Sequence, residues 1–275
     1  MSLAASTRSE TTKVFSTAAW WVIAIVMIVY VGGMAAGMAG LFGALSDGQL
    51  GPEAGMIPSE GLPAMVYSIA SSIGYVFPLL IGTLMVTAEF RHQTLTPTFL
   101  ATPRRGIALS GKVVVAALLG LLFGVMAIVV TVAPGAGLLA VFGIETQLGE
   151  GDTWAMLARI LIAFMLWTVI GVGLGALVRN QVAAIVIVLA FTQFVEPILR
   201  IAGGFLDWLN NITSFLPGAA SDTLVGTSFF TAAGGVDVGS IGVGLDWWGG
   251  GLVLAGYAVV LLVLGGLTSW RRDIT

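Results

Sequence analysis

The feature that most constrains this chain is a series of apolar stretches, each long enough to cross a lipid bilayer as a helix. A hydrocarbon core about 30 Å thick requires roughly 20 apolar residues in helical form. Six segments reach that length, at approximately 20–43, 64–87, 113–132, 156–177, 182–202 and 249–269. The sequence therefore predicts an all-α polytopic membrane protein, with about six transmembrane helices forming a single domain over residues 1–275.

The composition excludes several other classes of protein. Only 9% of the residues are charged and 57% are hydrophobic, whereas soluble domains carry roughly 25% charged residues. The net charge of −3 and the scattered basic residues argue against a nucleic-acid partner and leave membrane lipid as the expected surroundings. There is no cysteine and only one histidine, His92. Disulfides, thiolate zinc sites and histidine-based metal clusters are thereby excluded, and we expect neither a metal site nor a catalytic site.

The distribution of charge predicts the orientation in the membrane. Six spans place both termini on the same side. The two termini, the loop at 88–112 and the turn at Arg179 together hold nine of the eleven basic residues, while the loops of the other side hold only acidic ones. Basic residues concentrate in cytoplasmic loops. We therefore expect both termini to be cytoplasmic, together with the loop at 89–105.

Two segments outside the spans have helical patterns. Within residues 1–17, Ser6–Ser16 could form an interfacial helix, because Thr7 and Glu10 have the spacing of a capping box; a disordered tail is the alternative. Residues 203–246 form the largest extracellular segment. Amphipathic patterns at 205–209 and 224–231 predict re-entrant helices there, with a plain glycine-rich loop as the competing interpretation.

The loop at 89–105 combines charges, residues that start helices and exposed apolar groups. Thr94 or Thr96 before Pro97 suits the start of a helix, which Pro103 would end. Such a helix would leave three apolar side chains partly exposed, those of Leu95, Phe99 and Leu100. Two interpretations stay open: the helix docks into a partner protein, or it is a connector lying on the membrane with snorkelling arginines.

Charged residues inside the spans are the remaining candidates for function. Glu196 and Arg200 lie four residues apart, on one face of the fifth span near its outer end. Charges at such a depth are costly unless they are paired or face a cavity. The pattern predicts an ion pair with either a gating or a structural role. Arg159 in the fourth span could join this pair or extend outward to the interface.

Glycines at helical spacing predict close contacts between spans. They occur at 33 and 37, at 120 and 124, and at 171, 173 and 175. The last group is not a dinucleotide-binding fingerprint, because no strand precedes it.

The stretch from Glu89 to Lys112 resembles the first cytoplasmic loop of ABC-2-type transporter permeases, the membrane subunits of bacterial ABC exporters. The residues that carry the resemblance are Glu89, Arg91 with His92, Thr94, Leu100, Pro103, Arg104, Arg105 and Lys112. The chain departs from the family pattern at Gln93, where a glycine is usual. The segment with Arg8, Glu10 and Lys13 is similar to the family's N-terminal connecting helix, and 171–180, 216–220 and 271–273 are also family-like.

This resemblance implies a coupling helix within 89–105 that fits a groove on a separate ATPase subunit. The coupling residues would be Glu89, Arg91, Thr94, Phe99, Leu100, Pro103, Arg104 and Arg105. The assembly would contain two ATPase copies and two permeases, as a homodimer or with a close paralogue, in the bacterial cytoplasmic membrane. ATP and magnesium would bind the partner, and this chain accordingly lacks a Gly-x-x-x-x-Gly-Lys-Ser/Thr motif.

The function implied is export of a hydrophobic or amphipathic substrate such as a drug, a peptide or a lipid. Two alternatives stay open. One is a stand-alone secondary transporter, against which the sequence shows no inverted repeat and few ionisable residues within the spans. The other is a membrane receptor or assembly protein that transports nothing.

Overall fold

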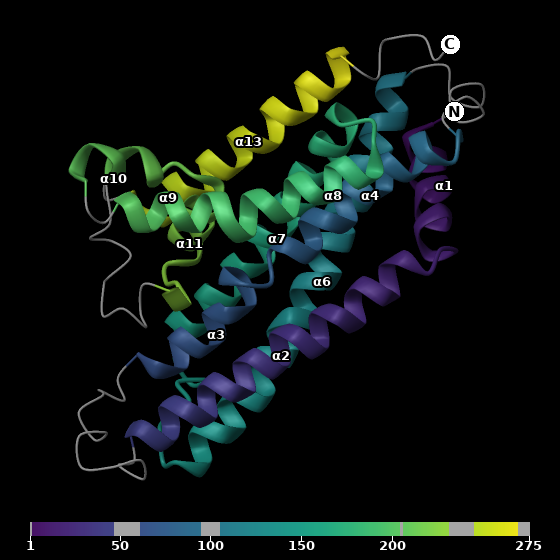
Figure 1. The fold of residues 1–275 in the computed structure, drawn as a ribbon. Coiled ribbons are helices and arrows are strands. Elements are labelled where there is room, and N and C mark those ends of the chain that lie inside the picture. The colour runs from purple at the N-terminus through teal and green to yellow at the C-terminus, as the bar shows by residue number, and fades with distance from the viewer. Residues whose placement is uncertain (1, 47–60, 95–104, 204–205, 231–244, 269–275) are drawn as a thin grey trace.

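The computed structural model describes residues 2–46, 61–94, 105–203, 206–230 and 245–268, and within these ranges the regular elements are all helices (Figure 1). Six spans are long and apolar enough to cross a membrane. The prediction of an all-α polytopic membrane protein is therefore confirmed.

The spans alternate in direction along the chain. They are α2 (Ala19–Ser46), α3 with α4 (Leu62–Ser72 and Val76–Arg91), α6 (Arg105–Val141), α7 (Gly151–Leu177), α8 with α9 (Gln181–Ala190 and Glu196–Gly203), and α13 (Trp247–Thr268). The third span is much longer than the predicted 113–132. Its apolar sequence continues to Val141, and the helix runs on through Pro134 without ending there.

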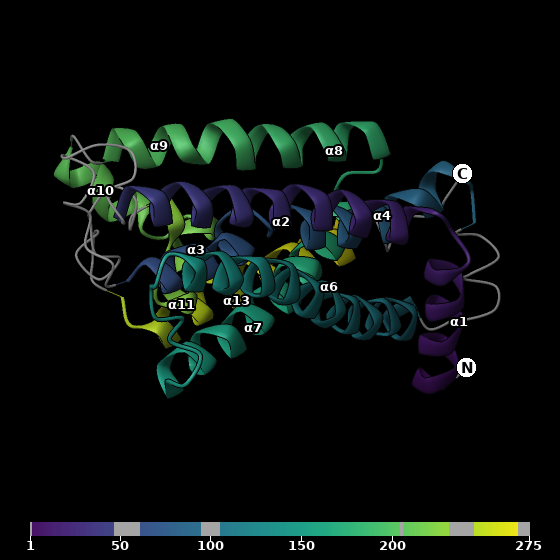
Figure 2. The ribbon, with the colours of Figure 1, turned by 90° about the horizontal axis from the view of Figure 1, so that it is seen from below.

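Short helices mark the two ends of the bundle. At one end, the α1 end, α1 (Leu3–Phe15) lies across the spans, and α4 and α13 finish there too (Figures 1 and 2). The other end, the α11 end, carries α10 (Asp207–Thr213) and α11 (Pro217–Val225). The predicted N-terminal helix and the helix predicted near 205–209 are confirmed as helical, in α1 and α10. The helix predicted at 224–231 is wrong, because α11 covers Pro217–Val225 and ends at Gly226, which has a positive φ of 92°.

The start of α1 differs from the prediction. The Ser2 hydroxyl accepts a hydrogen bond from the backbone N–H of Ala5 at 3.3 Å and so caps the helix. Thr7 consequently lies inside the helix and donates to the carbonyl of Leu3 at 3.0 Å. The predicted capping box of Thr7 and Glu10 is wrong, which frees the Glu10 side chain for a contact elsewhere.

Two spans are interrupted, and the interruptions face each other. The second span breaks between α3 and α4, and the fifth contains a π-helical turn over Phe191–Val195. Tyr75, in the break, stacks its ring on Trp167 of α7 with 4.6 Å between centroids. Its hydroxyl donates to the carbonyl of Thr192, in the π-helical turn, at 3.2 Å. π-Helical turns are frequent at functional sites.

The centre of the bundle is a close contact between α4 and α7. A Cβ at Gly82 would collide with the carbonyl of Thr168, and one at Gly171 with the carbonyl of Leu79. The two backbones can approach this closely only because both positions are glycine. The packing role predicted for the glycines at 120 and 171–175 is confirmed. For Gly33 and Gly37 it is wrong within this chain, since a Cβ at either would have no atom within 4 Å.

Candidate functional site

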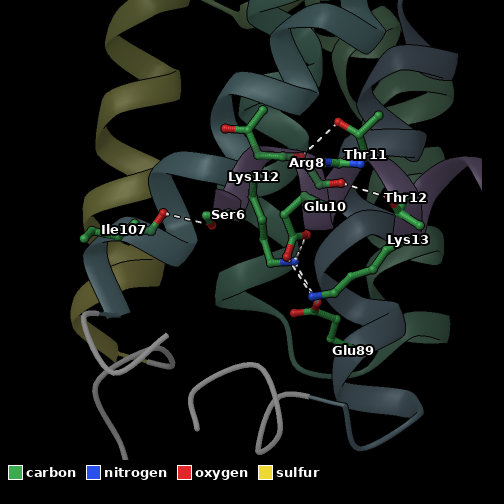
Figure 3. A network of polar contacts seen from close by, with 10 residues as sticks. Ser6, Arg8, Glu10, Thr11, Thr12, Lys13, Glu89, Ile107 and Lys112 are labelled. Atoms are coloured by element: carbon green, nitrogen blue, oxygen red, sulfur yellow. Dashed lines mark hydrogen bonds and ion pairs between the residues drawn. The ribbon is translucent and has the colours of Figure 1, made fainter. Parts of the chain in front are cut away.

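Four charged side chains meet at the α1 end and form what is called here the α1-end cluster: Glu10, Lys13, Glu89 and Lys112 (Figure 3). The Lys112 Nζ donates to Glu10 Oε2 at 2.5 Å and lies 2.8 Å from Glu89 Oε1. The Lys13 Nζ lies 2.7 Å from Glu10 Oε1 and 2.7 Å from Glu89 Oε1. Each lysine thus contacts both acids, and the cluster joins α1, α4 and α6.

The register of α1 explains why Glu10 is buried. The buried residues of this helix are Ser6, Glu10 and Val14, at a spacing of four that places them on one face. That face packs on α6, where the Ser6 hydroxyl donates to the carbonyl of Ile107 at 3.4 Å. Lys13, one turn from Glu10, reaches the same acids from the edge of the face. A helix without this apolar and small-residue stripe could not bring its acid into the bundle.

The α1-end cluster is buried but balanced in charge. Lys112 is 0% exposed and both acids are buried, whereas the Lys13 side chain is 37% exposed. Two ammonium groups face two carboxylates, so pairing offsets the cost of removing these charges from water. Burial by itself would lower the pKa of Lys13, but the carboxylates of Glu89 and Glu10 outweigh that effect and raise this pKa above its ordinary value of 10.5.

The structure describes only some of the predicted coupling residues. Glu89 enters the α1-end cluster, and the Arg91 guanidinium donates to the Gln181 side chain at 3.3 Å at the start of α8. Thr94 ends a described range, and Arg105 opens α6. Four of the predicted residues lie outside the described residues: Phe99, Leu100, Pro103 and Arg104. Arg8 of the predicted connecting helix is exposed and takes no part in the cluster.

Lys112 is the member of the cluster that the sequence predictions did not select as a site residue. A signal for it was present, because it is a lysine in the second turn of a helix whose following residues are apolar throughout. A lysine at such a position must find acids or extend to water. Glu89 has the matching position near the end of α4, and one of its oxygens, Oε2, is buried without a hydrogen-bond partner.

A second set of polar side chains, the α11-end cluster, comprises Ser72, Glu196, Arg200, Ser221 and Asp222. The Arg200 Nη2 donates to Asp222 Oδ2 at 2.7 Å, and Glu196 Oε1 accepts from the backbone N–H of Ala219 at 3.0 Å. The predicted ion pair of Glu196 with Arg200 is therefore wrong. The two residues do share a face of α9, but each reaches a different turn of α11.

Three spans bind α11 through this cluster. The Ser72 hydroxyl, in α3, lies 3.3 Å from Asp222 Oδ1, and the indole N–H of Trp167, in α7, donates to Ser221 Oγ at 3.0 Å. Arg159 does not join the cluster. Its guanidinium lies 4.8 Å from the Trp247 ring centroid and beside Gly226, which caps the C-terminus of α11. The Glu196 carboxyl group thus lies at the N-terminus of α11 and the Arg159 guanidinium near its C-terminus.

The α11-end cluster differs from the first in its charge. Glu196 is 2% exposed and Asp222 is also buried, yet the cluster contains a single arginine, which pairs with Asp222. The Oε2 atom of Glu196 is buried and has no hydrogen-bond partner. Over the described part of the chain, no group of three or more histidine, aspartate or glutamate side chains could hold a metal ion.

Neither a family model nor a curated protein matches this chain.

Proposed function

We propose that this chain is the membrane-spanning permease subunit of an ATP-driven transporter, an exporter of a hydrophobic or amphipathic substrate powered by a separate nucleotide-binding subunit. The observation that carries the proposal is the α1-end cluster. It joins the two flanks of the 89–105 loop, through Glu89 and Lys112, directly to the N-terminal helix.

A soluble motor can drive a membrane bundle only if force applied to a loop reaches the spans. Glu89 lies near the end of α4 and Lys112 in the second turn of α6, and their charged groups are 2.8 Å apart. Removing one partner of a buried ion pair costs about 3–5 kcal/mol. A push on the loop would therefore move α1, α4 and α6 together rather than separate them.

The α4–α7 contact would carry this motion to the centre of the bundle. The backbones of these helices touch at Gly82 and Gly171, with no long side chain between them to absorb a displacement. Packed interiors transmit strain because they contain few voids. The α1 end would face the cytoplasm in this proposal, since Arg8, Arg91 and Arg179 all belong to it and basic residues favour that side.

The test is purification of the tagged chain from its native membrane, followed by measurement of ATP hydrolysis. We expect a soluble ATPase to remain bound, in about two copies for two permease chains, with a turnover that the permease changes. The combined variant Arg104→Glu, Arg105→Glu and Phe99→Asp should release the ATPase while the thermal unfolding of the spans stays the same. Arg271→Glu with Arg272→Glu is the matched control, because it reverses two charges in the C-terminal tail.

Undiminished association of the loop variant would show that the 89–105 loop is not the docking element. Transport by the isolated chain in vesicles without ATP would contradict the whole proposal. That second outcome would favour a stand-alone secondary transporter. One observation supports this alternative, namely the unpaired acid Glu196 within the fifth span, since ion-coupled transporters place such residues at their coupling sites.

A further inference from the structure

The α11-end cluster contains one more buried acid than it has cations to neutralise. Arg200 points its guanidinium at Asp222, at 2.7 Å, and forms no ion pair with Glu196. The Oε1 atom of Glu196 accepts a hydrogen bond from the backbone N–H of Ala219, while its Oε2 atom is buried and has no partner. A carboxylate in this position would be an uncompensated charge within a membrane span, which is among the costliest arrangements in a protein.

Among the residues that the structure describes, the other charged or titratable groups around Glu196 supply no second cation. Tyr75 and Tyr257 are the phenols within electrostatic reach. The Tyr75 hydroxyl donates a hydrogen bond to the carbonyl of Thr192 at 3.2 Å, and the Tyr257 hydroxyl donates one to the carbonyl of Phe215 at 3.1 Å. Arg159 lies at the opposite end of α11, about 12 Å away by the rise of the helix. The first turn of α11 packs on the carboxyl group itself, since a Cβ at Gly218 would collide with it.

We propose that Glu196 is a proton-binding site, protonated while α11 is seated against α9, and that loss of this proton releases the N-terminal turn of α11. The proton comes from water and adds to the carboxylate to give the neutral acid. Oε1 can then still accept from Ala219, while the charge that the surroundings cannot balance is removed. A proton is also the one cation that needs no space beside the closely packed Gly218.

The sign of the pH dependence follows from linkage. The seated state holds one proton more than the released state, in which the carboxyl group reaches water and ionises. Low pH therefore favours seating and high pH favours release, with the ratio changing by up to about tenfold for each pH unit. This inference does not rest on the transporter proposal, because it concerns the isolated chain and requires neither ATP nor a partner subunit.

The direct test is infrared spectroscopy of the full chain in lipid nanodiscs, since a protonated carboxyl group has a carbonyl stretch that a carboxylate lacks. We expect this band at neutral pH in the unmodified chain, its loss as the pH rises, and its absence in Glu196→Gln. Glu89→Gln is the matched control, because Glu89 also has a buried oxygen without a partner but belongs to the balanced cluster. That variant should keep the band. A neutral-pH spectrum without the band, or a band unaltered in Glu196→Gln, would overturn the assignment.

Accessibility of α11 provides a second measurement. The chain has no cysteine, so Ala220→Cys, at a buried position in the first turn of α11, makes a single reporter for a membrane-impermeant maleimide. Gly149→Cys, at an exposed position with open space around it, corrects for the pH dependence of the thiol. Labelling of Ala220→Cys relative to this control should rise at least about tenfold from about pH 5 to about pH 9. With Glu196→Gln it should stay at the low-pH value.

A relative labelling rate that does not change with pH, or that rises equally in Glu196→Gln, would overturn the proposal. Replacing sodium by choline at constant pH should change nothing. A rise in labelling on that replacement would assign the site to a metal cation instead of a proton and would equally overturn it.

Discussion

The two polar clusters have the same structural role at opposite ends of the bundle, but their balance of positive and negative groups differs. Each holds a short helix, α1 or α11, against the long spans. The α1-end cluster sets two lysines against two glutamates, whereas the α11-end cluster sets one arginine against a glutamate and an aspartate. A cluster with equal numbers of positive and negative groups holds its helix in place over a wide range of pH. An unbalanced one needs a further positive charge, and its helix can be released when that charge leaves.

The largest expected effect is the loss of stability in Lys112→Met. Lys112 is completely buried and contacts both acids, so its removal leaves two carboxylates with only Lys13 between them. We expect the free energy of unfolding to fall by about 3–5 kcal/mol, measured by chemical denaturation in detergent micelles. Lys13→Met is the matched control, because Lys13 also contacts both acids but has a half-exposed side chain, and it should cost about 1 kcal/mol. Equal losses in the two variants would show that burial does not set the strength of this cluster.

A smaller effect should separate the two acids of the α11-end cluster. Asp222→Asn removes the charge that pairs with Arg200 and should lower the free energy of unfolding near pH 7 by about 2 kcal/mol. Glu196→Gln keeps the acceptor for the N–H of Ala219 and should change it by less than about 0.5 kcal/mol. A loss in Glu196→Gln as large as that in Asp222→Asn would mean that Glu196 is held as a carboxylate and would remove the difference between the clusters.

Two neighbouring serines provide the next comparison. Ser72 accepts a hydrogen bond from the buried N–H of Phe229 at 3.2 Å, so Ser72→Ala should cost about 1 kcal/mol. Ser71 has one weak contact, at 3.5 Å from Ser221, and Ser71→Ala should cost less than about 0.5 kcal/mol. Thermal unfolding of the two variants in the same detergent checks this order. The reverse order would show that the hydrogen bond from Phe229 to Ser72 contributes less than the contact between Ser71 and Ser221.

The smallest expected effect is the response of the α1-end cluster to alkali. The pKa of Lys13 in the folded chain is raised above 10.5, so its stabilising contribution is complete below that pH and is lost as the pH rises through the folded value. In the Glu196→Gln background, which removes the pH dependence proposed for α11, unfolding temperatures should therefore stay level from neutral pH to about pH 10 and fall above it. Lys13→Gln should lack this fall. A decline that already begins near neutral pH would indicate that the cluster is not balanced as described.

Much of the fold could be predicted because it depends on local sequence. Spans of the required length follow from runs of apolar residues, and the position of α10 follows from the amphipathic pattern at 205–209. The errors of the sequence predictions also concern local features, namely where a helix begins or ends. Ser2 rather than Thr7 caps α1, and the apolar run of α6 continues beyond the length that a bilayer needs.

The candidate sites could be predicted only in part. The sequence indicated Glu196 and Arg200 as charges within a span, and the resemblance to a permease family indicated Glu10, Lys13 and Glu89. Each of these residues lies in one of the two clusters. The sequence did not indicate their partners. Lys112 and Glu10 are 102 positions apart, and Asp222 appeared to be an ordinary acid of an outer loop until α11 placed it inside the bundle.

The sequence alone thus determined how many helices cross the bilayer and where the isolated charges lie, because the thickness of the hydrocarbon core and the cost of charge within it act on each segment separately. Tertiary structure decided which charges meet. Pairing depends on the rotation of each helix about its axis and on contacts between helices far apart in the chain. Neither is encoded in any single segment. These contacts give the α1-end cluster equal numbers of acids and cations, and they give the α11-end cluster one more acid than cations.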